Sequence, residues 1–335
     1  MQILENYPLK RLHTFGTDVF ASEFVEFENR DEAGYFLKNH DQNKQYFVLG
    51  GGSNLLFIND YLGCILYPSY KGVEVTELTD EFVYIKAAAG EVWDDFVAYC
   101  VRTGYYGIEN LSHIPGNVGA VPVQNIGAFG VEVKDFIHEV RGIEISTGKA
   151  VTFSPEKCRF GYRYSVFKDE LKDRFLITEV LFRLNRREKL VLEYGNLQSE
   201  LTGKRPDAMM VRESIIHIRE SRLPDPKDIG NAGSFFKNPV VDKQFAGDLC
   251  REYENMPVFP VDEKHVKLAA GWLIEKSGWK GRNMGNAGVY HKQALVLINN
   301  GKATGKEIHD LSIAIQEDVL RKFSVRLEPE VLIIY

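Results

Sequence analysis

Cysteine is scarce in this chain, and its thiols show no pattern that builds a disulfide framework or a metal centre. No two of them form a CxxC pair, and none clusters with histidine at the spacing of a zinc site. We therefore predict four small, reduced, buried hydrophobic residues: Cys64, Cys100, Cys158 and Cys250.

Long apolar runs are also missing. No stretch approaches the roughly 18 consecutive apolar residues that cross a bilayer. The opening segment, MQILENYPLKRLHTFGTD, has neither the apolar core nor the small-residue cleavage site of a signal peptide. These absences predict a cytoplasmic protein that has no membrane partner.

An excess of positive charge is absent as well. The chain has 41 Lys and Arg residues against 47 Asp and Glu residues, a net charge of −6. Such mild acidity gives no general attraction to nucleic acid, so we expect no nucleic-acid partner. What is present is a globular balance, with 44% hydrophobic and 26% charged residues over 335 positions, enough for two or three domains.

Strand-like and helix-like stretches alternate along the chain, which predicts an α+β fold. Runs rich in β-branched and aromatic residues predict strands at 45–49, 82–88, 140–145, 175–184 and 294–298. Helical spacing and end signals at Gly104, Gly278 and Thr304 predict helices at 93–102, 266–277 and 305–323. The charged, irregular segment 186–205 is expected to bridge two halves of the chain.

A first glycine loop, LGGGSNLL at 49–56, follows an apolar strand. Consecutive glycines let backbone N–H groups point into one space, which is typical of a phosphate-binding nest; a tight hairpin is the alternative. The loop lacks the Rossmann fingerprint because Leu55 stands where a glycine is required. The later GKATGK at 301–306 is one residue short of a P-loop and predicts only a turn and a helix start.

A second loop, IPGNVGAVPVQNIGAFGV at 114–131, is longer and carries few large side chains. Its backbone can therefore lie along a ligand, and the side-chain amides of Gln124 and Asn125 suit hydrogen bonding to a polar ring edge. An irregular segment of this length is unusual as mere structure. Together the two loops indicate a large, elongated cofactor.

The two loops, in this order, resemble the FAD-binding domain of the PCMH or vanillyl-alcohol-oxidase type. From about Phe15 to Tyr335 the chain resembles the UDP-N-acetylenolpyruvoylglucosamine reductase family. Further matching motifs are CRFGYRYSVFK at 158–168, RLPDPKDIGNAGSFFKNP at 222–239, VKLAAGWLIEKSGWKG at 266–281, HKQALVLINNG at 291–301 and LEPEV at 327–331. Several unrelated motifs in one order are more specific than a single glycine loop.

The resemblance implies an FAD-binding domain of two subdomains, 1–70 and 71–203, with a C-terminal strand that returns to the first. It also implies an α+β substrate-binding domain at 204–335. The FAD contacts that it implies lie in the two glycine loops: Gly50, Gly51, Gly52, Ser53, Asn54, Leu55, Ile114, Pro115, Gly116, Val118, Gly119, Ala120, Gln124, Asn125, Gly127 and Gly130. His113 precedes the second loop, and we interpret it as a turn or core residue rather than a covalent flavin link.

The resemblance further implies a two-step reduction in peptidoglycan precursor synthesis. NADPH reduces FAD, and the reduced flavin delivers hydride to C3 of the enolpyruvyl ether of UDP-N-acetylglucosamine, giving UDP-N-acetylmuramate. Charge then develops at C2 and spreads into the carboxylate, so the protein must stabilise that charge and protonate C2. We expect a monomer in which NADPH and substrate use one cleft in turn.

Three residues are implied as catalytic. Arg163 offers a guanidinium fork to the substrate carboxylate, although a structural ion pair is the simpler interpretation of an isolated arginine. Ser234 is implied as the proton donor to C2, where an isolated serine would only suggest a turn. Glu330 is implied to hold or share a proton, because an ionised carboxylate would repel the substrate; Glu328 is its alternative.

The substrate contacts implied by the family motifs are Tyr194, Arg222, Lys237, Asn238, Lys267 and Gln293. The tyrosine is typical of the longer, type I subgroup, whose loop closes over the diphosphate. The chain departs from the family at Phe259, where a tyrosine is common, and at Leu332, where an arginine is common. Two rival functions stay open: an oxidase of the same flavin fold, and a non-catalytic module that binds a UDP-sugar or nucleotide.

Overall fold

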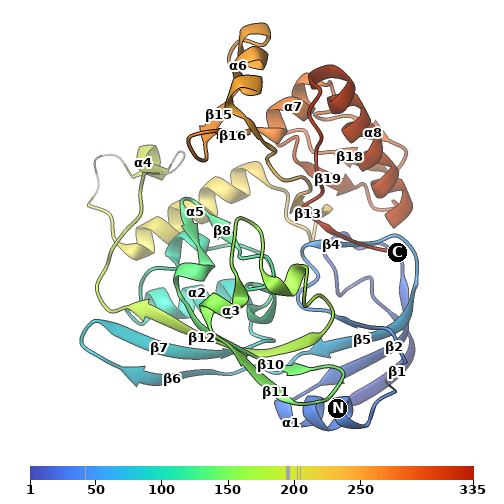
Figure 1. The fold of residues 1–335 in the computed structure, drawn as a ribbon, viewed down its shortest axis with the longest axis vertical. Coiled ribbons are helices and arrows are strands. Elements are labelled where there is room, and N and C mark those ends of the chain that lie inside the picture. The colour runs from blue at the N-terminus through green and yellow to red at the C-terminus, as the bar shows by residue number, and fades with distance from the viewer. Residues whose placement is uncertain (42, 194–196, 202, 204) are drawn as a thin grey trace. The chain divides into compact units, whose positions relative to one another are not determined.

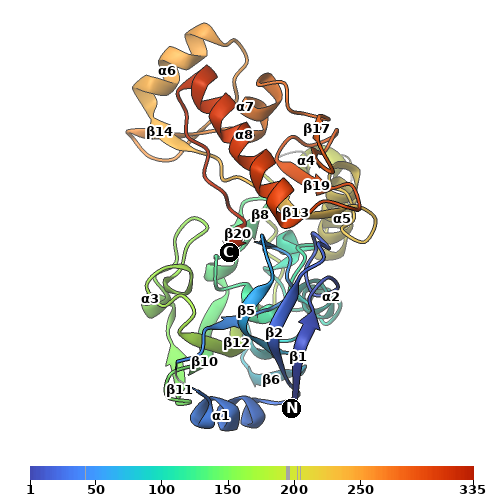
Figure 2. The same cartoon turned by 90° about the vertical axis from the view of Figure 1, so that its right-hand side faces the viewer.

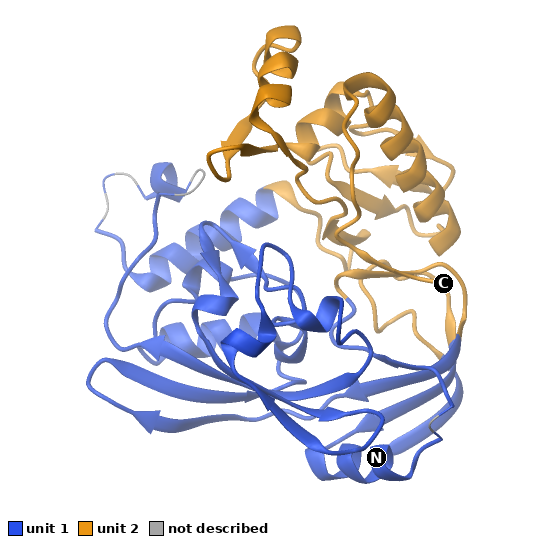
Figure 3. Cartoon of the chain, viewed as in Figure 1, with its two compact units in different colours: residues 1–7, 21–52, 62–221 blue, residues 8–20, 53–61, 222–335 orange. Residues whose placement is uncertain are grey.

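The structure, a computed structural model, describes residues 1–41, 43–193, 197–201, 203 and 205–335, and it divides the chain into two units (Figure 3). Unit 1 consists of residues 1–7, 21–52 and 62–221. Unit 2 consists of residues 8–20, 53–61 and 222–335. The division of the sequence at 70 and 203 into three parts stays a prediction, and both units include N-terminal stretches.

A five-stranded antiparallel sheet forms the centre of unit 1, with strand order β11-β10-β12-β7-β6 (Figure 1). Its strands are β6 (Val73–Leu78), β7 (Phe82–Ala88), β10 (Ile137–Glu144), β11 (Ala150–Phe153) and β12 (Phe175–Asn185). Helix α2 (Trp93–Arg102) packs on this sheet, since the rings of Trp93 and Phe96 contact that of Phe182. The predictions for β7 and α2 are confirmed at both ends.

The second sheet of unit 1 has four strands in the order β1-β2-β5-β3. They are β1 (Gln2–Pro8), β2 (Phe20–Phe27), β5 (Tyr61–Pro68) and β3 (Tyr46–Val48). β3 is parallel to β5 and lies at the sheet edge, so the first glycine loop leaves from an edge strand. Helix α1 (Arg30–Asn39), capped by the Asn29 side chain, contributes Leu37 to the core beneath this sheet.

Short elements and one long helix complete unit 1. They are η1 (Glu109–Leu111), η2 (Val118–Ala120), β8 (Gly127–Ala128), β9 (Val131–Glu132), η3 (Val133–Asp135), α3 (Pro155–Cys158), η4 (Val166–Lys168), α4 (Leu197–Glu200) and α5 (Ala208–Arg222). The sequence analysis missed α5, although its buried residues Val211, Ile215 and Ile218 have helical spacing.

Unit 2 contains a four-stranded sheet with strand order β13-β19-β18-β17 (Figure 2). Its strands are β13 (Gly230–Ser234), β17 (Asn283–Met284), β18 (Ala287–Val289) and β19 (Val296–Asn299). Helix α8 (Gly305–Phe323) buries Ile308, Leu311, Ile315 and Val319 in the core of the unit and begins with a capping box between Thr304 and Glu307. The prediction for α8 is confirmed. A separate parallel pair joins β4 (Leu55–Phe57) to β20 (Leu332–Ile334).

The remaining part of unit 2 corrects one prediction. A three-stranded sheet joins β14 (Val240–Asp242), β16 (His265–Leu268) and β15 (Val258–Pro260), accompanied by α6 (Lys243–Glu252) and α7 (Ala270–Lys276). The helix predicted at 266–277 is therefore wrong over its first residues. Val266 and Leu268 are buried on either side of Lys267, and Val266 pairs with β14 on one side and β15 on the other, so strand pairing outweighs the helical pattern.

The cysteine prediction holds for three residues and is wrong for one. Cys64, Cys100 and Cys158 are buried, and burial raises the pKa of the Cys158 thiol to about 12. Cys250 is exposed, because it lies on α6 outside the core-facing side that Ala246 and Leu249 occupy. In the described part of the chain, no helix is long and apolar enough to cross a bilayer, and no cluster of three His, Cys, Asp or Glu side chains could hold a metal ion.

Candidate cofactor and substrate site

The two glycine loops meet within unit 1. A Cβ atom added to Gly51 would lie 2.7 Å from Gly116 Cα, and one added to Gly50 would lie 3.3 Å from the Cβ of Ala120. No side chain fits between backbones at this distance. Position 51 therefore requires glycine because of this close contact, and not because of its backbone dihedral angles. Two loops far apart in sequence therefore form one surface.

The first loop presents unused backbone donors on this surface. Strand pairing ends where the Leu49 N–H donates to the Leu66 carbonyl at 3.0 Å. Beyond it, the amides of Gly50, Gly51 and Gly52 donate no hydrogen bond to another described residue, and Gly52 has φ +60°. Consecutive amides of this kind bind an anionic group such as a diphosphate. This part of unit 1 fits the phosphate region of a dinucleotide.

The second loop is held rigidly against the connection between β7 and α2. Val118 N–H donates to the Glu91 carbonyl at 2.8 Å, and Gly119 N–H donates to the Ala89 carbonyl at 3.0 Å. A Cβ at Gly119 would lie 2.7 Å from that of Ala89. The Val118 side chain is buried in the core. The amides of Val118 and Gly119 therefore support the loop.

Arg163 lies against the second loop. Its Nη2 donates to the Gly127 carbonyl at 2.7 Å, and a Cβ at Gly127 would lie 3.0 Å from its Nη1. The arginine sits in a turn with φ +53°, which is rare for a residue with a side chain and typical of functional positions. The Ser165 hydroxyl donates to the Val123 carbonyl at 2.5 Å, so this turn is bonded to the loop at two points.

The side chain of Asn125 is bonded within unit 1, and its contact with FAD stays a prediction. Its side chain is fully buried and donates to the Gly161 carbonyl at 2.9 Å and to the Glu132 carboxylate at 3.0 Å. It also accepts from the Lys134 N–H at 3.1 Å. Both ends of the amide are engaged by the protein, so it connects the second loop to the Arg163 turn. Its neighbour Gln124 accepts from Lys168 Nζ at 3.5 Å.

Helix α5 supplies two arginines that the sequence analysis missed together with the helix. Arg212 forms a bidentate pair with Asp94 at 2.6 and 2.8 Å, and Asp94 also accepts from the His113 N–H. Burial alone would raise the pKa of Asp94, but the bonds from Arg212 and His113 outweigh it and lower that pKa. Arg219 donates to the His113 carbonyl at 3.0 Å, so both arginines hold the start of the second loop.

The surroundings of Arg219 shift the pKa of its guanidinium. Burial lowers the pKa of its guanidinium to about 10; Asp94 opposes this effect and Arg163 adds to it. The two arginines on α5 are seven residues apart, which places them on one helix face. That spacing was the available signal for this cluster.

Within unit 2, the structure brings Ser234 and Glu330 onto neighbouring segments. The Glu330 N–H donates to the Phe235 carbonyl at 2.8 Å, and the Lys237 N–H donates to the Glu328 carbonyl at 2.9 Å. The Ser234 side chain is exposed beside the fully buried ring of Phe235. Two motifs at opposite ends of the C-terminal region thus form one short antiparallel pairing.

The second half of the first glycine loop belongs to unit 2. Asn54 Nδ2 donates to the Glu330 carbonyl at 3.2 Å, and the Leu332 N–H donates to the Asn54 carbonyl at 3.0 Å. Leu55 is buried in β4, opposite Leu332 of β20. Ser53 is also in unit 2. The residues after Gly52 therefore anchor the segment that carries Glu330.

Glu328, the first glutamate of LEPEV, forms an ion pair with Lys237: its carboxylate lies 3.2 Å from Lys237 Nζ. Glu328 has a cationic partner on the surface of unit 2, whereas the Glu330 backbone is bonded to both Phe235 and Asn54. The Glu330 backbone is therefore attached to the segment that carries Ser234.

The other predicted substrate residues lie in several places in unit 2. Lys267 stands opposite Val240 on one side and Phe259 on the other, so the three side chains share one face of the small sheet. Asn238 accepts from the Ala270 N–H at the start of α7, and Gln293 Oε1 accepts from the Leu295 N–H at 3.4 Å. Arg222 ends α5 and is exposed. Tyr194 lies outside the described residues.

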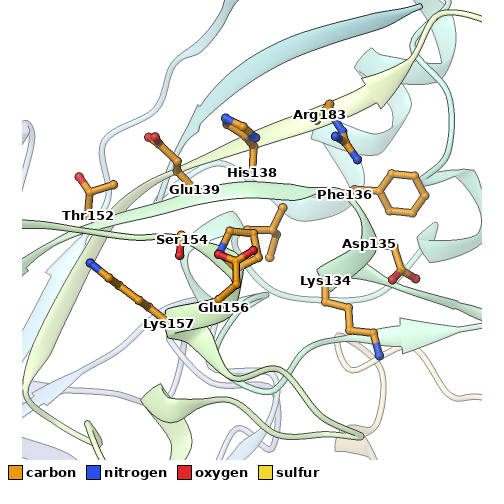
Figure 4. Close-up of a pocket in the computed structure, with 12 residues that line it drawn as sticks. Lys134, Asp135, Phe136, His138, Glu139, Thr152, Ser154, Glu156, Lys157 and Arg183 are labelled. Carbon is orange, nitrogen blue, oxygen red and sulfur yellow. The ribbon is translucent and has the colours of Figure 1, made fainter.

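A cavity of about 630 Å³ in unit 1 contains none of the predicted site residues (Figure 4). Its lining mixes cations with carboxylates, among them Lys134, Asp135, Glu139, Lys157 and Arg183. A lining of mixed charge favours no single class of ligand, so the cavity does not compete with the glycine loops as a cofactor site.

Comparison with known proteins agrees with this geometry. Residues 22–154 match the family described as FAD binding domain, and residues 225–334 match UDP-N-acetylenolpyruvoylglucosamine reductase, C-terminal domain. An FAD-binding domain followed by a reductase domain defines the class, a flavin-dependent oxidoreductase with an α+β fold.

Full-length relatives identify the family. A UDP-N-acetylenolpyruvoylglucosamine reductase of Flavobacterium johnsoniae is 42% identical and covers 100% of both chains. That of Bacteroides fragilis is 46% identical over 98% of both. The reductase structure from Thermus caldophilus, 23% identical, has a TM-score of 0.68 and covers 100% of this chain and 98% of its own. The chain belongs to the UDP-N-acetylenolpyruvoylglucosamine reductase family, which confirms the resemblance and FAD as cofactor.

We predict that Gly51→Ala weakens FAD binding at least tenfold, because the added methyl group would strike the backbone of Gly116. Flavin content and FAD affinity measured by fluorescence test this. Gly34→Ala is the control from the same unit, since a Cβ at Gly34 would lie 3.8 Å from Ile143 Cδ1, an ordinary contact. Stoichiometric FAD in purified Gly51→Ala would contradict the prediction.

We predict that Asp94→Asn lowers the free energy of unfolding by roughly 2 kcal/mol at pH 7, because it removes a charged, hydrogen-bonded partner of Arg212. Since the folded-state pKa of Asp94 is lowered, its contribution is complete above its unfolded pKa of about 4 and is lost at lower pH. Urea unfolding of the wild type and of Asp94→Asn at pH 7, 5 and 3 measures the difference between their free energies of unfolding.

The exposed Asp95, one residue along the same helix, provides the control for this measurement. Asp95→Asn should change the unfolding free energy by no more than about 0.5 kcal/mol. A difference between wild type and Asp94→Asn that stays constant from pH 7 to pH 3 would rule out the linkage.

Proposed function

We propose that this protein reduces the enolpyruvyl ether of UDP-N-acetylglucosamine to UDP-N-acetylmuramate, with NADPH as electron donor. The observation that carries the proposal is the pairing of the Ser234 and Glu330 segments, which places an alcohol and a carboxyl group on adjacent backbones. This is the donor set that protonation beside a developing carboxylate-stabilised charge requires. The proposal includes action as a monomer in the cytoplasm.

FAD, when bound, accepts hydride from the nicotinamide and gives it to the substrate carbon. The chain's part is to hold the cofactor. The amides of Gly50, Gly51 and Gly52 suit its diphosphate. Gly116, Gly127 and Gly130, without side chains, let the second loop approach it closely. Ile114, Pro115 and Ala120 are proposed as further contacts.

Ser234 is proposed as the group that delivers a proton to C2. A hydroxyl is a weak acid, so it serves only a strongly basic, carbanion-like centre. The exposed position of Ser234 leaves its hydroxyl accessible, and the buried rings of Phe235 and Phe236 keep the adjacent backbone in place. Glu330 is proposed to stabilise the same intermediate by holding a proton that it shares with the substrate carboxylate.

Arg163 is proposed as the cation that stabilises the charge on the substrate carboxylate. A guanidinium remains charged and offers two parallel donors to a carboxylate, so its interaction strengthens as negative charge develops. The bond from Nη2 to Gly127 and the bonded turn around it fix the direction of the side chain. Little reorganisation is then needed during the reaction.

The small sheet of unit 2 is proposed to contact the nicotinamide or the nucleotide of the substrate. Lys267 offers an ammonium group between two apolar side chains, Val240 and Phe259, and Phe259 is 46% exposed. A phenyl ring supplies stacking without a hydroxyl contact. Arg222, Lys237, Asn238 and Gln293 are proposed for the diphosphate and uracil, as is Tyr194.

The test of this function is optical. We expect purified protein to be yellow, to lose its flavin absorbance when anaerobic NADPH is added, and to recover it when the enolpyruvyl substrate is added. An oxidase would recover its colour with oxygen and turn over without NADPH. A binding module would be colourless. Either of those two outcomes would exclude the reductase.

We predict that Ser234→Ala slows reoxidation of the reduced flavin by the enolpyruvyl substrate by about 10²- to 10⁴-fold, because proton delivery to C2 is lost. Reduction of the flavin by NADPH should stay within about twofold of wild type. Stopped-flow absorbance separates the two half-reactions. The control is Ser277→Ala, since the Ser277 hydroxyl donates to the Leu273 carbonyl at the end of α7. Equal slowing of both half-reactions would contradict the assignment.

A further inference from the structure

Asn231 is a buried polar residue three positions before Ser234 on β13, and every polar group of its side chain is bonded. Its side chain is 2% exposed. Nδ2 donates to the Ile229 carbonyl at 2.8 Å and to the Pro224 carbonyl at 3.2 Å. Oδ1 accepts from the Gly233 N–H at 2.9 Å. The amide thus connects three points of the backbone around the start of β13.

One of these bonds closes an irregularity in the strand. Asn231 pairs with Ile298 and Ser234 with Val296, so β13 has one residue more than β19 between the two pairs. Gly233 takes φ +66° inside this bulge. Bulges of this kind interrupt side-chain alternation and redirect the residue that follows. The direction of the Ser234 side chain therefore depends on the bulge that Asn231 closes.

Both flanks of the bulge are attached to fixed backbone. On one side, the Asn231 N–H donates to the Thr14 carbonyl at 3.0 Å. On the other side, the Phe235 N–H donates to the Leu295 carbonyl at 2.8 Å, and the Phe235 carbonyl accepts from Glu330. Between these anchors, Ser234 pairs with Val296, and the Asn231 side chain bonds the Gly233 N–H inside the bulge.

We propose that Asn231 is a positioning residue for proton delivery: it holds the bulge that directs the Ser234 hydroxyl. The inference rests on the proposed function, since it matters only if Ser234 is the donor. Asparagine suits the position because a short side chain must supply one acceptor and two donors. Aspartate keeps the acceptor and loses both donors, and alanine loses all three.

The experiment measures both half-reactions of FAD-bound enzyme by stopped flow. Asn231→Ala is expected to slow substrate-dependent flavin reoxidation by about 10²-fold, the effect of displacing a reacting group by about 1 Å. Reduction by NADPH should stay within about twofold of wild type. A merely structural residue would change flavin content or both rates together. Unchanged reoxidation in Asn231→Ala would overturn the inference.

Asn299 provides a matched control in the same unit. It is 6% exposed, donates to the Phe15 carbonyl at 2.9 Å, and accepts from the N–H groups of Gly301 and Ala303. It therefore loses a comparable set of bonds on change to alanine, without a bond to the bulge. Asn299→Ala should lower stability and leave the ratio of the two half-reaction rates unchanged.

A double mutant distinguishes failure of the positioning role of Asn231 from failure of the proposed role of Ser234. In a Ser234→Ala background, Asn231→Ala should add less than about threefold to the loss, because its effect operates through the missing hydroxyl. If Asn231→Ala slowed reoxidation as much in the Ser234→Ala background as it does in the wild type, the positioning role would be wrong. Wild-type reoxidation in Ser234→Ala alone would instead refute the donor assignment.

Asn231→Asp is the second variant, to be measured in the same way if Asn231→Ala does not retain FAD. It preserves the acceptor for the Gly233 N–H while placing a carboxylate near two carbonyl groups. We expect reoxidation intermediate between wild type and Ser234→Ala, and normal reduction by NADPH. Wild-type reoxidation in this variant would show that the bonds to Pro224 and Ile229 have no part in positioning.

Discussion

The close approach of Gly51 to Gly116 is the contact on which the cofactor part of the structure depends. An added Cβ would lie 2.7 Å from the opposing Cα, so the two loops touch through bare backbone. That contact leaves three consecutive amides of the first loop unbonded to other described residues. It also joins the first loop to a second one that is itself attached to β7, α2 and the Arg163 turn.

Buried amide and guanidinium groups then hold the loops in place. Asn125 connects the second loop to the Arg163 turn, Asn231 closes the bulge before Ser234, and Arg212 secures the loop start through Asp94. Each buried polar group costs free energy unless it is fully bonded, and these groups are bonded at several points. The residues expected to do chemistry are thus supported by polar residues that are not expected to touch the substrate.

Local pattern predicted the elements in which the sequence signals agree with the packing. β7, α2 and α8 have the expected bounds because their periodicity, caps and core-facing residues agree with one another. The helix prediction was wrong at 266–268, because these residues form a strand that pairs with two neighbouring strands. It also missed α5, whose buried residues nevertheless have helical spacing.

The sequence by itself determined the class of the protein, because the order of the motifs and the glycines that follow a strand can be recognised without the three-dimensional structure. It also determined which residue types are available for the chemistry. Only the tertiary structure decided that Asn125 supports the protein, that Glu328 is paired with Lys237, and that Ser234 lies beside the Glu330 segment. Those facts depend on hydrogen bonds between residues far apart in the chain, and no local spacing encodes such pairings.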